Sequence, residues 1–178
     1  MNLKPLDIYV VLKLIAIGDR HWSYNTLAVE IGLSPSEVHG AAKRLLKAGL
    51  ALPNEARNLR PARKPLLEFL GHGIRYVFVP ERGGMTRGLP TGYAALPLSA
   101  SITADGGEPP PVWPDPEGEV RGLSFSPLHK SAPSAAKADP LFYELLALVD
   151  ALRAGRARER QKAEKLLEER LWGAGAHG

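Results

Sequence analysis

A chain of 178 residues without cysteine excludes disulfides, zinc–thiolate sites, iron–sulfur clusters and thiol nucleophiles. Apolar residues make up 44% and charged residues 24%, as in an ordinary globular protein, and no apolar run approaches the roughly 20 residues of a membrane span. The net charge is +4, but residues 1–96 hold 13 Lys and Arg against 7 Asp and Glu, whereas residues 97–178 hold 10 against 12. We therefore expect a cytoplasmic protein whose N-terminal half is basic enough to bind a polyanion.

The first expected element is a helix from Pro5 to about Ile17. Proline suits the first turn of a helix, and the residues after it are apolar on nearly every helical face. Such a helix is expected to be well buried, in the core or at a subunit contact.

Residues 22–50 carry the most specific pattern in the chain. They predict two short helices joined by a turn at Gly32, because glycine permits the positive φ that ends a helix in a tight turn. Ser34 can cap the second helix, and Glu37 can complete a capping box. The second helix is expected to end at Gly49. Its buried face is an apolar stripe formed by Val38, Ala41 or Ala42, Leu45 and Leu46.

This combination of a turn glycine, a capping box, a core stripe and the small residue Ala28 resembles the helix–turn–helix of winged-helix transcriptional regulators, including the MarR-like group. The phrases Leu-Ala-x-x-Ile-Gly-Leu-Ser (27–34) and Lys-Arg-Leu-x-x-Ala-Gly-Leu (43–50) are typical of that family. The resemblance covers residues 1 to about 52. It implies an N-terminal winged helix–turn–helix in a mainly α protein with a small β component, and binding to double-stranded DNA as a homodimer.

The face of the second helix that points away from the apolar stripe predicts the DNA contacts. Ser36 and His39 lie near the helix start, where side chains could reach base edges in the major groove, and Gly40 would permit a close approach to the duplex. The basic residues of this helix would meet phosphates. The complete set on this helix and its turn is Ser34, Ser36, His39, Gly40, Lys43, Arg44 and Lys47.

The wing of that family, a strand, a basic loop and a return strand, is not expected directly after this helix, because Pro53 ends the strand-like run at residues 50–52. Residues 54–73 instead predict a basic loop and a short helix that ends at Gly71. The basic residues of this segment are a second candidate for contact with the DNA backbone, with an ordinary solvated loop as the alternative. They are Arg57, Arg60, Arg63 and Lys64.

The β-branched and aromatic residues 74–80 predict a strand. The glycine-rich residues 81–88 predict a turn that carries Arg82 and Arg87. A hairpin at this place could serve as a displaced wing that reaches the minor groove or the DNA backbone. It would complete a DNA-binding domain over residues 1–96.

The remaining chain predicts an arm and a helical region. Residues 97–138 are rich in proline and glycine and are expected to form an extended arm packed on a neighbour, with a strand near Val120 to Phe125. Residues 139–172 predict one or two amphipathic helices, capped by Asp139 and interrupted at Gly155. Their broad apolar face favours a dimer contact or a contact with another protein.

The pattern indicates no catalytic residues, no metal ligands and no cofactor. The histidines lack ligand spacing and the acidic residues are dispersed. We therefore interpret the chain as a sequence-specific, dimeric DNA-binding transcriptional regulator, whether repressor or activator, rather than an enzyme. Two alternatives stay open: an antitoxin of a two-gene toxin–antitoxin module that binds its partner through the C-terminal region, and a plasmid replication or maintenance protein.

Overall fold

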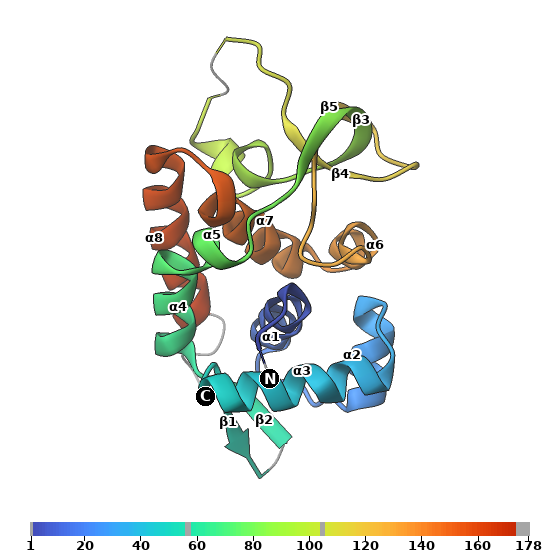
Figure 1. Cartoon of the computed structure of the whole chain (residues 1–178), viewed down its shortest axis with the longest axis vertical. Coiled ribbons are helices and arrows are strands. Elements are labelled where there is room, and N and C mark those ends of the chain that lie inside the picture. Colours follow the sequence, from blue (N-terminus) through green and yellow to red (C-terminus); the bar gives the residue numbers. More distant parts are fainter. Residues whose placement is uncertain (1, 56–57, 104–105, 174–178) are drawn as a thin grey trace.

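The computed structural model describes residues 2–55, 58–103 and 106–173. Helices form most of these residues, and two small sheets accompany them (Figure 1). A mainly α protein with a small β component is therefore confirmed. Within the described residues, no helix combines the length and the apolar character that crossing a membrane requires.

The N-terminal part consists of three helices followed by a β-hairpin. The turn between the second and third helices lies where the sequence predicts it, with Gly32 at φ +71°, and Gly49 at φ +77° follows the third helix. The capping box at Ser34 is also confirmed, because its Oγ accepts from the N–H of Glu37 while Glu37 Oε2 accepts from the N–H of Ser34. The elements are α1 (Pro5–Ile17), α2 (Tyr24–Ile31), α3 (Pro35–Ala48), β1 (Ala51–Asn54) and β2 (Asn58–Pro61).

The hairpin corrects the expectation that Pro53 prevents a strand directly after α3. The strands β1 and β2 pair antiparallel, with Pro53 opposite Leu59. Ala62 donates its N–H to the carbonyl of Leu50, and hydrogen-bonded pairs alternate along an antiparallel ladder. Pro53 and Pro61 therefore occupy the positions whose nitrogen faces away from the partner strand, where proline costs no ladder bond.

The middle of the chain departs from the sequence prediction at residues 74–90. The expected strand at residues 74–80 begins with a short helix that packs beside α7, and the expected turn at residues 81–88 is a strand. Ile74 is fully buried, so packing decides the local structure against the strand propensity of the β-branched residues. The elements here are α4 (Arg63–His72), α5 (Ile74–Val77), β3 (Arg82–Pro90), the 3-10 helices η1 (Gly92–Ala94) and η2 (Leu98–Ala100), β4 (Pro111–Pro114) and β5 (Val120–Phe125).

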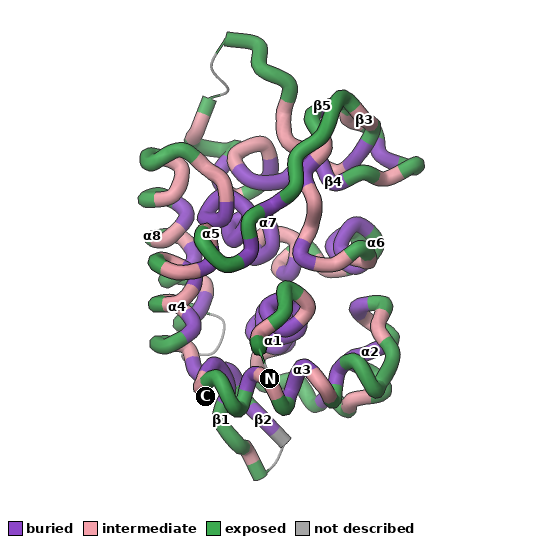
Figure 2. Tube along the Cα trace, in the orientation of Figure 1, coloured by how far each residue is buried: buried purple, intermediate pink, exposed green. Residues whose placement is uncertain are grey.

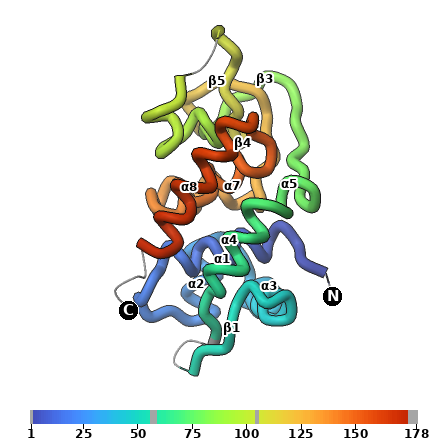
Figure 3. The backbone as a smooth tube through the Cα atoms, turned by 90° about the vertical axis from the view of Figure 1, so that its left-hand side faces the viewer, coloured from blue at the N-terminus to red at the C-terminus, as the bar shows by residue number. Residues whose placement is uncertain are grey.

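Three strands close on themselves at the end of the molecule opposite α3 (Figures 1 and 3). Strand β3 pairs antiparallel with both β4 and β5, which pair parallel to each other. Gly88 stands at the crowded centre, because a Cβ there would lie 2.0 Å from the carbonyl oxygen of Trp113. The strand expected near Val120 to Phe125 is confirmed, and it belongs to this sheet.

The C-terminal helices belong to the core of the chain. They are α6 (Ala132–Ala138), α7 (Pro140–Ala154) and α8 (Ala157–Gly173). The predicted cap is confirmed, because Asp139 Oδ1 accepts from the N–H of Phe142, and Gly155 separates α7 from α8 as expected. Helix α7 packs against α1, α6 and α8, and its apolar side chains are buried (Figure 2). The apolar face that favoured a dimer or partner contact is thus covered by the chain itself.

Two ion pairs attach α1 to the elements on either side of it. Asp7, fully buried in the first turn of α1, accepts from Nε of Arg44 on α3 at 2.8 Å. Lys13 donates Nζ to Asp139 at the start of α7, with 2.7 Å between nitrogen and oxygen. Helix α1 is therefore the packed layer between α3 and α7, which fixes α3 relative to the C-terminal half.

Candidate nucleic-acid interface

Helix α3 divides into a buried face and an exposed face. Val38, Ala41, Ala42 and Leu45 are buried, whereas Leu46, expected in the stripe, is partly exposed. Four predicted contact residues on the opposite face are exposed, namely Ser36, His39, Lys43 and Lys47, and Gly40 is half-buried between them. These polar and basic residues occupy one face of α3. The helix itself lies at the edge of the molecule (Figure 2).

His39 is oriented by a neighbour that sequence reasoning missed. Its imidazole stacks on the ring of Tyr24, with 3.9 Å between the ring centroids and 28° between the planes. Tyr24 begins α2, so the stack spans the two helices on either side of the turn at Gly32. An exposed ring held in one plane loses little rotamer freedom when it binds a flat partner such as a base.

Arg44 has a structural role that the sequence analysis did not assign. Its Nε donates to both carboxylate oxygens of Asp7, at 3.0 and 2.8 Å, and 14% of its side chain is exposed. The hydrogen bond and charge of Asp7 raise the pKa of the Arg44 guanidinium. We correct its assignment from phosphate contact to positioning of α3 on α1.

The hairpin β1–β2 follows α3 directly, and its described residues add one exposed cation to this end of the molecule. Arg60 lies exposed on β2, opposite the partly exposed Leu52. Arg57, the other basic residue predicted here, lies outside the described residues. Of the basic residues on α4, Lys64 is exposed, but Arg63 donates Nε to the carbonyl of Leu171 at 2.6 Å and so binds the end of α8.

Arg82 and Arg87 do not form a displaced wing. Both lie on β3 in the closed sheet, at the opposite end of the molecule from α3 and the hairpin (Figures 1 and 3). Arg82 donates to the carbonyl of Ala154 at 3.0 Å, and Arg87 is exposed on the same strand. A duplex against α3 would therefore not meet either residue.

Helix α1 and the C-terminal half both support the turn between α2 and α3. Tyr9 donates its hydroxyl to the carbonyl of Ile31 at 2.9 Å, and Ser131 donates Oγ to the carbonyl of Gly32 at 3.2 Å. His129 stacks on Tyr9, with 5.3 Å between the centroids. The last residue of α2 and the turn glycine are thus held by side chains far away in the sequence.

Gly32→Ala is expected to destabilise the fold more than Gly49→Ala. Both glycines have positive φ, which costs an alanine about 1 kcal/mol. At Gly32 a Cβ would also lie 2.7 Å from Oγ and 2.8 Å from Cβ of Ser131, whereas no atom lies within 4 Å at Gly49. Overpacking adds about 1–3 kcal/mol at Gly32. Urea unfolding of the two variants measures the difference, and equal losses would argue against the contact with Ser131.

The half-buried His129 predicts a pH dependence of folding stability. Burial lowers the pKa of its imidazole below the ordinary value of 6.5, and the nearby Lys130 also lowers it, although Glu37 partly opposes both. Below pH 6.5 the unfolded chain binds a proton that the folded chain binds less readily, so stability falls as the pH drops. We expect His129→Phe, which keeps a ring on Tyr9, to weaken the loss in free energy of unfolding between pH 8 and pH 5.5. The same change at the exposed His21 serves as the control, and an unaltered pH profile in His129→Phe would contradict the assignment.

The described residues were also compared with the arrangement of a metal site and with known proteins. Over the described part of the chain, no three His, Asp or Glu side chains come together as they would around a metal ion. Comparisons with protein-family models, curated proteins and solved structures return no match.

Proposed function

We propose that residues 1–61 form a winged helix–turn–helix that binds double-stranded DNA, and that the protein is a transcriptional regulator. In this proposal α3 enters the major groove and the hairpin β1–β2 is the wing. The observation that carries it is the exposed face of α3, where Ser36, His39, Lys43 and Lys47 stand free of the core while the opposite face is buried. A short basic helix that presents polar side chains in this way matches the shape of a major groove.

The charge of this surface supports the proposal. Lys43, Lys47 and Arg60 are exposed cations on α3 and the hairpin that follows it. Glu37 is the single acidic residue of α3, and its carboxylate turns back to accept from the N–H of Ser34. That hydrogen bond lowers the pKa of Glu37, so its negative charge is held at the helix N-terminus. The outward face of α3 is therefore polar or positive, while the hairpin adds the exposed Glu55 as well as Arg60.

Selection of bound sequences from a random duplex library, followed by anisotropy over a salt series, tests the proposal. We expect an enriched sequence motif. We also expect the logarithm of the binding constant to fall linearly as the logarithm of the salt concentration rises. A homodimer, which remains a prediction, would enrich two half-sites about one helical turn apart. Absence of binding even at low salt would reject DNA as the ligand.

The antitoxin alternative stays a prediction. It relied on an apolar C-terminal face free to bind a partner, but α7 is buried by the chain itself and α8 buries Ala163, Leu167 and Leu171. Nothing in the described part of the chain favours an origin over a promoter as the DNA target, so transcriptional regulation stays the proposal.

A further inference from the structure

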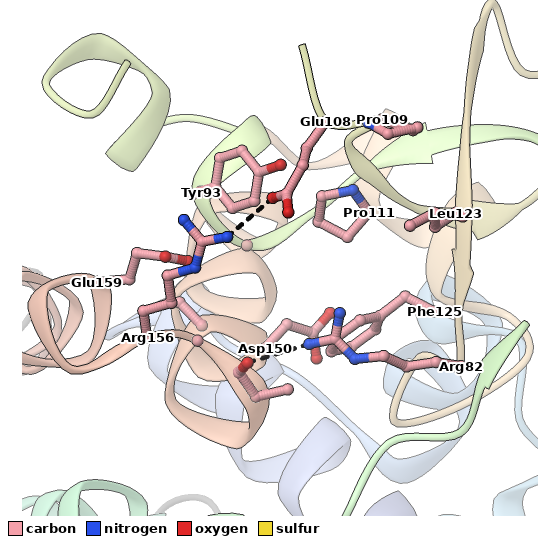
Figure 4. Close-up of a pocket in the computed structure, with 14 residues that line it drawn as sticks. Arg82, Tyr93, Glu108, Pro109, Pro111, Leu123, Phe125, Asp150, Arg156 and Glu159 are labelled. Atoms are coloured by element: carbon pink, nitrogen blue, oxygen red, sulfur yellow. Dashed lines mark hydrogen bonds and ion pairs between the residues drawn. The ribbon is translucent and has the colours of Figure 1, made fainter. Parts of the chain in front are cut away.

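A cavity of about 430 Å³ lies between the closed sheet and the junction of α7 and α8 (Figure 4). Its walls come from β3, η1, β5, the chain before β4 and the α7–α8 junction. Sites for small molecules have volumes of this order. No described residue of α3 or of the hairpin lines it, so the cavity is separate from the proposed DNA interface.

One cation of the cavity lacks a balancing carboxylate. Arg82 reaches over the ring of Phe125, with 5.3 Å from its guanidinium carbon to the centroid, and donates one hydrogen bond to the carbonyl of Ala154. Among the described residues, no carboxylate forms an ion pair with it. Its other N–H groups therefore stay available to a ligand anion.

One carboxylate of the cavity likewise lacks a balancing cation. Glu159 on α8 lines the cavity and, over the described chain, joins no ion pair. Its Cβ lies 3.2 Å from the point that a Cβ on Gly155 would occupy, and Gly155 follows Ala154, whose carbonyl Arg82 binds. Arg82 and the base of the Glu159 side chain thus both lie beside the α7–α8 junction, and both residues line the cavity.

The other carboxylates of the cavity are already balanced. Glu108 pairs with Arg156 at 2.9 Å, both of them exposed, and the buried Asp150 pairs with Arg153 at 2.8 Å. Tyr93 stands among the charged groups: burial raises the pKa of its hydroxyl, Glu108 and Glu159 raise it further, and Arg156 and Arg82 oppose them. The rest of the lining is mostly apolar, formed by Pro109, Pro111, Leu123, Phe125, Ala151 and Ala154.

We propose that this cavity binds a small zwitterion, an α-amino acid with an apolar side chain. Its carboxylate would bind Arg82, its ammonium group would bind Glu159, and its side chain would lie against Leu123 and Phe125. Arg82 is exposed and Glu159 half-buried, so both charges are accessible to a ligand. A zwitterion can pair with both of them at once, whereas a simple carboxylic acid or a simple amine pairs with only one. The proposal does not depend on DNA binding.

Calorimetric titration of the full chain, without DNA, with L-leucine, L-phenylalanine and L-methionine tests the site. We expect at least one to bind, and Arg82→Gln and Glu159→Gln each to weaken binding about tenfold or more, because each removes a charge-assisted hydrogen bond. Matched controls are Arg87→Gln on the same strand and Glu168→Gln on the same helix, both exposed and outside the cavity. They should bind as the natural chain does.

Analogues that lack one charge test the zwitterion without any change to the protein. 4-Methylpentanoate lacks the ammonium group of leucine, and isopentylamine lacks its carboxylate, so both are expected to bind at least about tenfold more weakly than leucine. The proposal is overturned if none of the three amino acids binds at millimolar concentration. It is also overturned if 4-methylpentanoate binds as tightly as leucine, or if Glu159→Gln leaves the affinity unchanged.

Discussion

Asp150→Ala is expected to lower the free energy of unfolding by about 3–5 kcal/mol, because it leaves the buried Arg153 without its counter-charge. Asp150 is 2% exposed and accepts from Thr91 Oγ1 at 2.6 Å, Trp113 Nε1 at 2.7 Å and Arg153 at 2.8 Å. Arg153 in turn donates to the carbonyls of Phe78 and Ser126. This network joins α7 to the closed sheet and to the chain on both sides of it.

Urea unfolding followed by circular dichroism measures this loss. Glu168→Ala, at an exposed position on α8, is the matched control and should change stability by no more than about 0.5 kcal/mol. The double variant Asp150→Ala/Arg153→Ala is expected to cost less than the sum of the two single variants, since it leaves no charge unpaired. A loss below about 1 kcal/mol in Asp150→Ala would show that the network contributes little.

Lys43→Ala/Lys47→Ala is expected to produce the largest change in DNA binding. Both lysines are exposed on α3, and if each meets one phosphate, the slope of log affinity against log salt becomes shallower by about 1.8. The loss should be similar across DNA sequences, because phosphate contacts carry no sequence information. Anisotropy over a salt series with the selected duplex and with an unrelated duplex measures both quantities.

Lys162→Ala/Lys165→Ala is the matched control for net charge. These lysines are exposed on α8, so the control removes the same two charges from a face that the proposal leaves free of DNA. Its salt slope should equal that of the natural chain. If both double variants reduce the slope equally, the binding reflects overall charge rather than a specific face.

Local sequence signals predicted most of the N-terminal helices. Pro5, the turn glycine Gly32, the capping box at Ser34 and the terminating Gly49 each act over one or two helical turns, and the structure places α1 and α3 accordingly. The cap at Asp139 acts over the same short range. Signals of this kind require no knowledge of the rest of the fold.

The sequence does not reveal features that depend on a contact with a residue far away in the chain. Arg44 is at a position on α3 from which it could point to solvent, but Asp7, 37 residues earlier, binds its guanidinium. Arg63 is bound by the carbonyl of Leu171, which is 108 residues later. Residues 74–77 have strand propensity, yet burial of Ile74 places them in a helix. In each case the contact that decides the outcome is visible only once the chain has folded.

The prediction that Pro53 prevents a strand after α3 is wrong for a different reason. Proline is disfavoured in central strands, but a two-stranded hairpin has no central strand. The prolines at positions 53 and 61 follow the same two-residue alternation as the non-hydrogen-bonded pairs of the ladder. That spacing is a signal that the sequence itself contains.

In the proposed complex, the exposed face of α3 lies against a DNA duplex. Amide chemical shifts of the isotopically labelled full chain, followed by NMR during titration with the selected duplex, test it residue by residue. We predict that the largest changes fall on Ser36, His39, Lys43 and Arg60, while Arg87 and the other residues of the closed sheet stay unchanged. Changes confined to the closed sheet or to α8, with α3 unaffected, would contradict the claim.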